Sequence, residues 1–216
     1  MTNEQPSWRV ALAPGQSHGF YANPGWWDIR GTRHEVEDVR ALLLALPPLR
    51  PGAAVVDLGA GTGNFVALLA AYYPRVRYTL IDPNADGLDR AAEKLTAVYP
   101  DLDFSLVAEP IVPEPETPLP GAPFQLATST IALHDIVRPA APDDPDGQAE
   151  HRRRHVALLR RVWSSLEPGG HFVYLDSIWP GFRVTQHLET LKQAGFDEVD
   201  AAYVDGRFLV CGGQRR

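Results

Sequence analysis

The sequence predicts a single α/β domain built on a doubly wound, mostly parallel β-sheet. Apolar runs alternate with amphipathic helical segments along most of the chain, which is typical of βαβ units. The first run ends in a turn with three alternating glycines, Gly59, Gly61 and Gly63. The last two runs are joined by Asp205-Gly206, a pair that favours a two-residue type I′ hairpin turn and therefore an antiparallel last strand.

The expected elements follow from side-chain spacing. Strands are expected at 54–58, 76–81, 103–107, 124–128, 171–176, 198–204 and 207–211, where short apolar runs are bounded by turn residues. Helices are expected at 32–46, 64–73, 84–99, 151–166 and 185–194, where apolar residues recur at helical spacing. Pro47-Pro48 and Pro74 end the first two helices, because proline cannot continue the helical hydrogen bonds. Polar residues and chain breakers predict an exposed loop at 138–148.

Composition limits the function classes. The chain has 216 residues, of which 44% are hydrophobic and 22% charged, enough for one well-covered domain. The formal net charge of −7 gives no broad basic face, which argues against nucleic acid as substrate. The single cysteine, Cys211, excludes an internal disulfide and a cysteine-rich metal site. Residues 1–10 lack a signal pattern and no apolar run approaches about 18 residues, so we expect a cytoplasmic protein without a membrane partner.

The N-terminal segment differs from the rest of the chain. Residues 1–34 form an arm rich in proline, glycine and aromatic residues, and residues 35–216 form the domain. Trp26 and Trp27 each carry a large apolar area, so we expect them to cover something. They either pack on the domain surface or form an aromatic wall against a substrate or a cationic ligand.

The glycine turn predicts the kind of ligand. Its spacing is G-x-G-x-G rather than the G-x-G-x-x-G of a dinucleotide fold, and Asp57 stands on the strand before it. A pyrophosphate would be repelled by that carboxylate. A nucleoside with a cationic group and no phosphate fits better, and S-adenosylmethionine is the common ligand of this kind.

At these residues the sequence resembles the class I S-adenosylmethionine-dependent methyltransferases. Their first motif is apolar-apolar-acid-apolar-Gly-x-Gly-x-Gly, matched here by Val55 to Gly63, and the run from Leu159 to Tyr174 resembles their helix, Pro-Gly-Gly turn and strand. The resemblance covers residues 35–213. It implies a seven-stranded sheet with an antiparallel last strand, S-adenosylmethionine as cofactor and S-adenosylhomocysteine as product.

The resemblance also implies cofactor contacts. Asp82, followed by Pro83, stands at the end of the second strand, where the family's acid accepts the ribose hydroxyls; its alternative role is helix entry. Glu109 is the expected adenine contact, although Ala108 stands where many relatives carry Asp, and a solvated loop acid is the alternative. The full expected cofactor set is Asp57, Gly59, Ala60, Gly61, Gly63, Asp82, Pro83, Glu109, Ser129 and Tyr21.

The segment after the fourth strand lies beneath the transferred methyl group in this family, which makes His134 the expected catalytic base. Its imidazole could accept a proton near neutral pH, with Asp135 as a possible orienting group; a purely structural role is the alternative. The expected acceptor-binding residues are Trp27, Thr130, His134 and Trp179, and no metal site is expected. The run His151-Arg152-Arg153-Arg154-His155 is interpreted as a solvated helix face.

These residues predict methyl transfer to an oxygen, nitrogen or carbon of a small-molecule substrate in secondary metabolism, without a metal. One alternative is cyclisation or elimination of S-adenosylmethionine itself, which would release methylthioadenosine. Another is a protein that binds S-adenosylmethionine without catalysis. The sequence gives no indication of oligomeric state.

Overall fold

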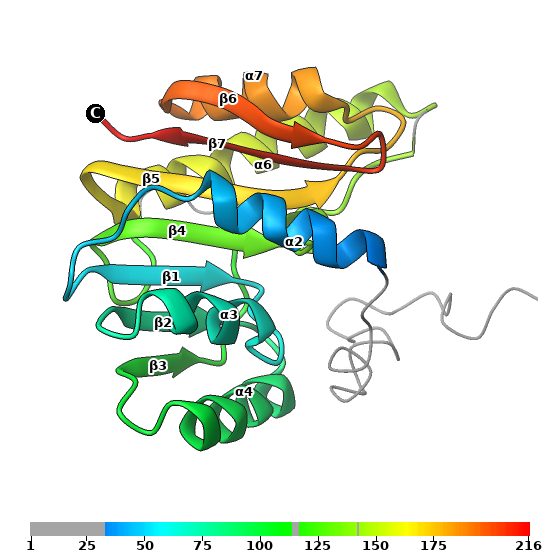
Figure 1. The fold of residues 1–216 in the computed structure, drawn as a ribbon. Helices are drawn as coiled ribbons and strands as arrows, with labels where there is room; N and C mark the ends of the chain where they lie inside the picture. The colour runs from blue at the N-terminus through cyan, green and yellow to red at the C-terminus, as the bar shows by residue number, and fades with distance from the viewer. Residues whose placement is uncertain (1–32, 114–116, 142) are drawn as a thin grey trace, which may run out of the picture.

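The computed structural model describes residues 33–113, 117–141 and 143–216 (Figure 1). They form a seven-stranded sheet with the strand order β3-β2-β1-β4-β5-β7-β6. Strand β7 pairs antiparallel with β5 and β6, whereas β1 to β5 pair in parallel with one another. The predicted fold class is therefore confirmed, including the antiparallel last strand. Nearly all of the expected N-terminal arm, with Tyr21, Trp26 and Trp27, lies outside the described residues.

The elements alternate as the sequence predicts. The strands are β1 (Ala54–Leu58), β2 (Arg77–Ile81), β3 (Phe104–Val107), β4 (Phe124–Thr130), β5 (Leu166–Ser177), β6 (Asp197–Val204) and β7 (Phe208–Gln214). The helices are α2 (Arg33–Ala45), α3 (Asn64–Tyr72), α4 (Ala85–Val98), α5 (Leu133–Ile136), α6 (Pro145–Ser165) and α7 (Val184–Ala194).

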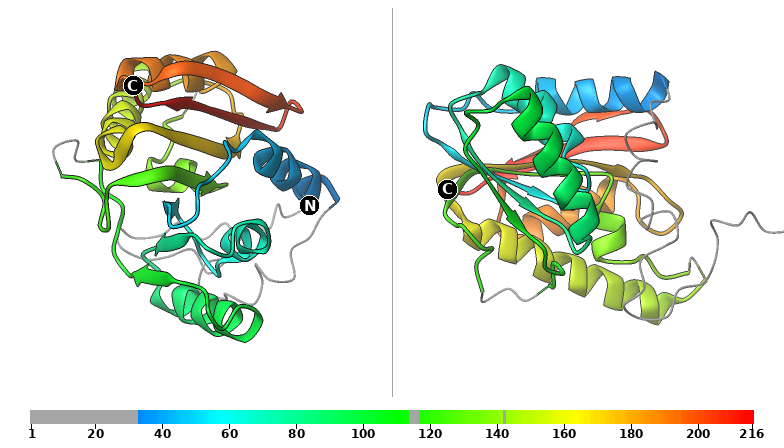
Figure 2. Two further views of the ribbon diagram at one scale, coloured as in Figure 1. Left: turned by 60° about the vertical axis from the view of Figure 1, so that its left-hand side comes forward. Right: turned by 90° about the horizontal axis from the view of Figure 1, so that it is seen from below.

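Helices cover both faces of the sheet. Helices α2, α3 and α4 lie on one face, and α6 and α7 lie on the other (Figure 2). The crossover from β3 to β4 has no helix in its described residues, 108–113 and 117–123. Ile111 and Leu119 fill that part of the core instead, and the Arg161 side chain on α6 holds the crossover through the carbonyl groups of Val112 and Thr117.

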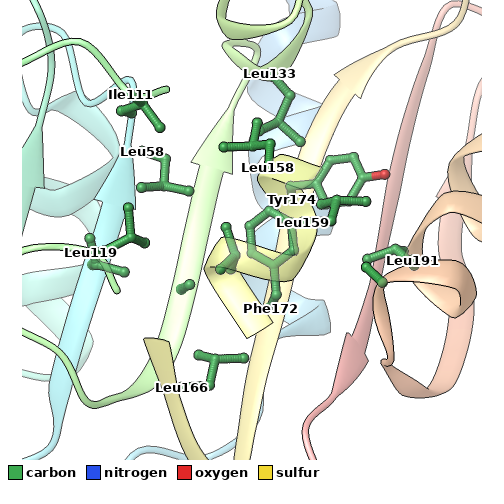
Figure 3. Close-up of a cluster of buried hydrophobic side chains, with 14 of the residues drawn as sticks. Leu58, Ile111, Leu119, Leu133, Leu158, Leu159, Leu166, Phe172, Tyr174 and Leu191 are labelled. Atoms are coloured by element: carbon green, nitrogen blue, oxygen red, sulfur yellow. The ribbon is translucent and has the colours of Figure 1, made fainter. Parts of the chain in front are cut away.

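Two apolar clusters, one against each face, fix the sheet in place. Figure 3 shows the cluster that joins Leu58 of β1 and Phe172 of β5 to Leu158 and Leu159 of α6 and Leu191 of α7. Each of these side chains is fully buried. Because burial of such a side chain contributes about 1.5–3 kcal/mol, this cluster sets the register on which the site depends.

The strand ends that carry the predicted motifs meet at one edge of the sheet. Leu58 at the end of β1 is in register with Ile81 of β2 and Ser129 of β4, and Thr130 is in register with Leu175 of β5. Parallel sheets bind ligands at this carboxyl edge. The edge therefore brings together the glycine turn, Asp82, the α5 segment and the end of β5.

Four boundaries differ from the prediction by two residues or more, one of them the end of β7, which continues to Gln214. Strand β4 continues to Thr130, so Ser129 and Thr130 belong to the strand rather than to the segment after it. Strand β5 begins at Leu166, because the segment before His171 adds to the sheet through a register shift against β4. Helix α6 begins at Pro145, within the expected loop, because the Asp144 carboxylate caps it by accepting a hydrogen bond from the Gly147 amide.

The hairpin between β6 and β7 is confirmed, but its turn is not the predicted type. Only Gly206 has a positive φ, 92°, whereas a type I′ turn requires two such residues. The Asp205 carboxylate instead accepts hydrogen bonds from the amides of Arg207 and Phe208. A side-chain turn therefore replaces the second left-handed residue.

Candidate cofactor and acceptor site

The glycine turn passes from β1 into α3 through left-handed backbone. Gly59, Gly61 and Gly63 have φ angles of 71°, 52° and 71°, which side-chain-bearing residues rarely adopt. A Cβ on Gly59 would lie 2.3 Å from the Cβ of Ala132, and one on Gly63 would lie 2.8 Å from the Cβ of Ala91. These two glycines are therefore required by packing as well as by backbone conformation.

Gly61 differs from its two neighbours. A Cβ on Gly61 would meet no atom within 4 Å, so its missing side chain leaves open space above the turn. A nucleoside or methionine moiety that crosses the strand end could occupy this open space. Ala60 and Gly61 are both partly buried on this bend.

Asp82 connects the ends of β1 and β2. Its Oδ2 accepts a hydrogen bond from the Gly61 amide at 2.9 Å, and its Oδ1 accepts one from the Asn84 amide at 2.8 Å. Burial raises the pKa of Asp82, and the two amide hydrogen bonds oppose that shift. Each carboxylate oxygen has a second lone pair, so the group can still accept two ribose hydroxyls while it holds the turn.

Asp57 lies beneath the glycine turn and is 3% exposed. The Thr128 hydroxyl donates to its Oδ1 at 2.9 Å. Burial raises the pKa of Asp57 to about 7; the Thr128 hydrogen bond opposes the shift and the charge of Asp82 adds to it. A buried carboxylate of this kind stabilises a nearby positive charge and repels a phosphate.

Lys94 is a further residue of the cofactor side, and the sequence motifs did not single it out. Its ammonium on α4 donates to the Thr62 carbonyl at 3.1 Å and also to the Asn64 side chain. The glycine turn is thus held from β2 by Asp82 and from α4 by Lys94. No pattern of spacing marks this lysine, because the contact joins the turn to the following helix.

The remaining cofactor candidates lie around this turn without a contact that fixes their role. Pro83 is exposed beside Asp82. Glu109 is exposed just after β3 and lines a cavity of about 10 Å³ with Ile81 and Arg161, too small for an adenine ring. The residues that are placed fit S-adenosylmethionine: open backbone at Gly61, a diol acceptor at Asp82 and a buried carboxylate at Asp57.

Comparison with known proteins agrees with this geometry. The family model described as "Methyltransferase domain" matches residues 30–199. The chain belongs to the methyltransferase domain family. S-adenosylmethionine is accordingly its cofactor, as the sequence predicted.

Curated relatives of this methyltransferase-family chain are longer than the segment that they share with it. Trans-aconitate 2-methyltransferase of Azoarcus sp. (strain BH72) is 40% identical over 150 residues, which are 68% of this chain and 49% of the relative. Demethylmenaquinone methyltransferase of Chlamydia trachomatis serovar D is 27% identical over 126 residues, 58% of this chain and 45% of the relative. The matched segment thus spans less than half the length of either relative.

Solved methyltransferase structures share the fold. An S-adenosylmethionine-dependent methyltransferase from Aquifex aeolicus superimposes with a TM-score of 0.65 at 16% identity, covering 90% of this chain and 99% of that one. The methyltransferase SibL in its apo form gives a TM-score of 0.62 at 20% identity, covering 94% and 60%. These similarities place the seven-stranded sheet of this chain in the class I methyltransferase fold.

On the side of the site where the acceptor is expected, His134 is held between two carboxylates. Its Nδ1 lies 2.6 Å from Oδ1 of Asp176, and its Nε2 lies 3.3 Å from Oδ2 of Asp135. Because a carboxylate only accepts, Nδ1 carries a proton and donates to Asp176. When the imidazole is neutral, Nε2 is therefore the nitrogen that can take up a proton, and 26% of the side chain is exposed.

Asp176, at the end of β5, is the functional candidate that the sequence analysis missed. It is fully buried and accepts hydrogen bonds from the His134 ring, the His134 amide and the Ser177 amide. An acid at the end of an apolar strand was a weak signal, and only the pairing of β4 with β5 brings it to His134. Asp135, the expected orienting group, instead faces the opposite nitrogen.

The two carboxylates shift the protonation of this cluster. Burial disfavours the charged imidazole, but the hydrogen bond and charge of Asp176 outweigh burial and raise the pKa of His134. Burial raises the pKa of Asp135 to about 6; the charge of Asp176 adds to the shift and Arg138 opposes it. The pKa of His134 therefore lies above its ordinary value, and that of Asp135 lies about 6.

Ser129 and Thr130 lie at the end of β4. Ser129 is fully buried and its hydroxyl donates to the Leu58 carbonyl at 2.9 Å, so the described structure does not expose it to a ligand. Thr130 is partly buried, and its hydroxyl oxygen has no hydrogen-bond partner among the described residues. Thr130 thus keeps a free polar group beside the α5 segment.

Trp179 lies beside His134 with ring centroids 6.1 Å apart in an edge-to-face arrangement.

The prediction of a solvated face at residues 151–155 is wrong for its two histidines. His151 is 5% exposed and His155 is fully buried, whereas Arg153 and Arg154 point to solvent. The four-residue spacing places both imidazoles on the buried face of α6, and this spacing was the available signal.

The described residues contain neither a metal-binding group nor a membrane-spanning helix. Across 33–113, 117–141 and 143–216, no group of three metal-ligating side chains has the geometry to hold an ion. In the same part of the chain, no helix combines the length and apolar character needed to cross a membrane.

Proposed function

We propose that this chain transfers the methyl group of S-adenosylmethionine to a small molecule, at a hydroxyl or an amine that carries a proton. The observation that carries the proposal is the contact between the two sides of the site. Gly59 packs against Ala132, and Ala132 stands two residues before His134. The cofactor turn and the candidate base are thus parts of one edge.

S-adenosylmethionine supplies a methyl group on a positively charged sulfur, and an electron-rich atom of the acceptor attacks that methyl group. The chain contributes binding, alignment and proton transfer. Asp82 and the Gly61 backbone would hold the nucleoside, and Asp57 would stabilise the positive charge. Nε2 of His134 would receive the acceptor's proton, and the Asp176 carboxylate would stabilise the resulting imidazolium.

A proton-bearing acceptor is favoured over a carboxylate acceptor. An acceptor with an ionised carboxylate has no proton to lose and needs no base. It would also approach the His134 ring, where Asp135 and Asp176 already lie and would repel its negative charge. The curated relatives are named for trans-aconitate and demethylmenaquinone, which are small molecules. They support the small-molecule class, whereas the carboxylates around His134 argue against an anionic nucleophile for this chain.

The N-terminal arm belongs to the proposal. Helix α2 begins at Arg33, at the carboxyl edge of the sheet (Figure 1). The arm therefore joins the domain beside the site, which supports Tyr21 and Trp27 as cofactor and acceptor contacts.

Location in the cytoplasm and a role in secondary metabolism are further parts of the proposal.

The test is methyl transfer from radiolabelled S-adenosylmethionine to a panel of small phenols, amines and carboxylic acids. The expected result is label in phenols or amines, in equal amount with S-adenosylhomocysteine. Label in carboxylic acids alone would refute the choice of acceptor. Methylthioadenosine formed without any acceptor would instead establish the cyclisation or elimination alternative, and tight binding without turnover would establish a non-catalytic protein.

A further inference from the structure

A pocket of three buried histidines lies behind the acceptor side and has no part in the proposed reaction. His151 and His155 come from α6 and His187 comes from α7, and their exposed fractions are 5%, 0% and 0%. Both ring nitrogens of His155 are buried and have no hydrogen-bond partner among the described residues. We call these residues the histidine pocket.

The occupant of the histidine pocket is Phe182. Its ring centroid lies 4.8 Å from His151, 4.8 Å from His155 and 4.4 Å from His187. The three imidazole rings thus surround the Phe182 ring. The packing of the imidazole rings against the Phe182 ring is favourable while the imidazoles are neutral.

Phe182 is one end of a tight turn whose other end is Trp179. The two residues exchange backbone hydrogen bonds, and their rings stack with centroids 5.5 Å apart. Gly181, with a φ of 96°, allows the chain to reverse between them. We call residues 179–182 the wall turn, because its Trp179 ring lies against His134.

We propose that the histidine pocket holds the acceptor wall in place through Phe182, and that protonation of its imidazoles releases the wall turn. The position of Trp179 in the acceptor site then depends on pH, whereas the positions of the glycine turn and Asp82 do not. The consequence for acceptor binding rests on the function proposed above; the release of the wall turn does not.

The charged groups around the histidine pocket favour its neutral form. Burial lowers the pKa of His151; the Val137 carbonyl opposes this, and Arg152 and Arg154 on the same helix add to it. Burial, with the neighbouring His187 and His151, holds the pKa of His155 well below its ordinary value.

The third histidine, His187, differs from the other two because an acid lies near it. Burial lowers the pKa of His187 to about 4, although Asp176 of β5 and the Ser177 backbone oppose the shift. The Tyr174 hydroxyl on β5 lies 3.0 Å from its Nδ1. Because the Asp176 carboxylate already accepts a hydrogen bond from the His134 ring, it only partly offsets the effect of burial on the pKa of His187.

The direction of the pH effect follows from these groups. Released histidines have an ordinary pKa of about 6.5, whereas docked ones resist protonation, so release becomes easier as the pH falls below about 6.5. Between pH 7.5 and 5.5 each histidine raises the ratio of released to docked protein by up to about tenfold. Three histidines together give up to about a thousandfold.

The experiment follows Trp179 fluorescence between pH 7.5 and 5, with His→Leu variants and with Trp179→Phe as the spectral blank. The wild type is expected to show release while its far-UV circular dichroism stays constant. His155→Leu should reduce the pH response by about tenfold, and His151→Leu should do the same if His155→Leu does not fold. His171→Gln, which changes a histidine on the face near α2, should behave like the wild type.

Two results would overturn the proposal: a Trp179 signal that changes only together with the circular dichroism, or a pH response of the same steepness in the His→Leu variants that fold. Calorimetry with S-adenosylhomocysteine at pH 7.5 and 5.5 separates this proposal from the proposed function. Absence of binding at both pH values would defeat the function and leave the release of the wall turn standing.

Discussion

The cofactor side of the site, at the ends of β1 and β2, and the acceptor side, at the ends of β4 and β5, are built in different ways. The cofactor side is a bend of backbone amides held by Asp82 and Lys94. The acceptor side is made of side chains from α5, the end of β5 and the wall turn, and the wall turn packs on histidines of α6 and α7. The first therefore has little freedom to change shape, whereas the second depends on packing between distant segments and on protonation.

This difference predicts which substitutions harm folding, which harm cofactor binding and which harm catalysis alone. The largest effect is expected for Gly59→Ala. The new Cβ would lie 2.3 Å from the Cβ of Ala132, at a φ of 71°. Left-handed strain and overpacking together should lower the free energy of unfolding by about 2–5 kcal/mol.

Urea unfolding measures that loss, and Gly61→Ala is the matched control. Gly61 has open space at its Cβ, so only about 1–2 kcal/mol of backbone strain is expected. Gly61→Ala should instead weaken S-adenosylhomocysteine binding, since its Cβ enters the ligand space. Equal destabilisation by the two variants would contradict the packing assigned to Gly59.

The second prediction concerns catalysis. His134→Gln should lower kcat about a hundredfold or more, because the acceptor's proton loses its base, and leave S-adenosylhomocysteine affinity unchanged. Asp176→Asn should move the activity profile along the pH axis, since Asp176 raises the pKa of His134. The imidazole should then hold its proton less strongly, and the rising limb of activity should shift to lower pH. An unchanged profile would show that Asp176 has only a structural role.

The third prediction concerns cofactor affinity. Asp82→Asn should raise the Kd for S-adenosylhomocysteine by about 10- to 100-fold, because charge-assisted hydrogen bonds contribute about 1.5–3 kcal/mol. Calorimetry measures this, with the exposed Asp89→Asn on α4 as control. His134→Gln, on the acceptor side, should leave the same Kd within about threefold. An equal rise in this Kd for Asp82→Asn and His134→Gln would show that the cofactor side and the acceptor side do not act separately.

The smallest effect is expected on stability at high pH. Burial raises the pKa of Asp57 to about 7, so the folded protein keeps this proton as the pH rises past the point where the unfolded chain loses it. Stability associated with Asp57 is therefore present at low pH and is lost as the pH rises through about 7. Asp57→Asn should therefore raise the free energy of unfolding, measured with urea, at pH 8 and leave it unchanged near pH 4.

The same contrast explains what the sequence could predict. Asp57, the three glycines and Asp82 stand close together along the chain, so local spacing predicted both the strand-turn-helix and the class of ligand. His134 was predicted as the base from its place after β4. Asp176 and the histidine pocket escaped, because their contacts depend on the pairing of β4 with β5 and on the packing of α6 against α7. Charge patterning misassigned His151 and His155, since three arginines beside them indicated a solvated face.

The most direct measurement of the central claim is calorimetric titration of the protein with S-adenosylhomocysteine and, separately, with NAD. At pH 8, where the Asp57 carboxyl group is mostly ionised, the account predicts saturable heat with S-adenosylhomocysteine, reduced in Asp82→Asn. It predicts none with NAD, because the Asp57 carboxylate repels a pyrophosphate at the glycine turn. Tight binding of NAD together with no heat from S-adenosylhomocysteine would contradict it.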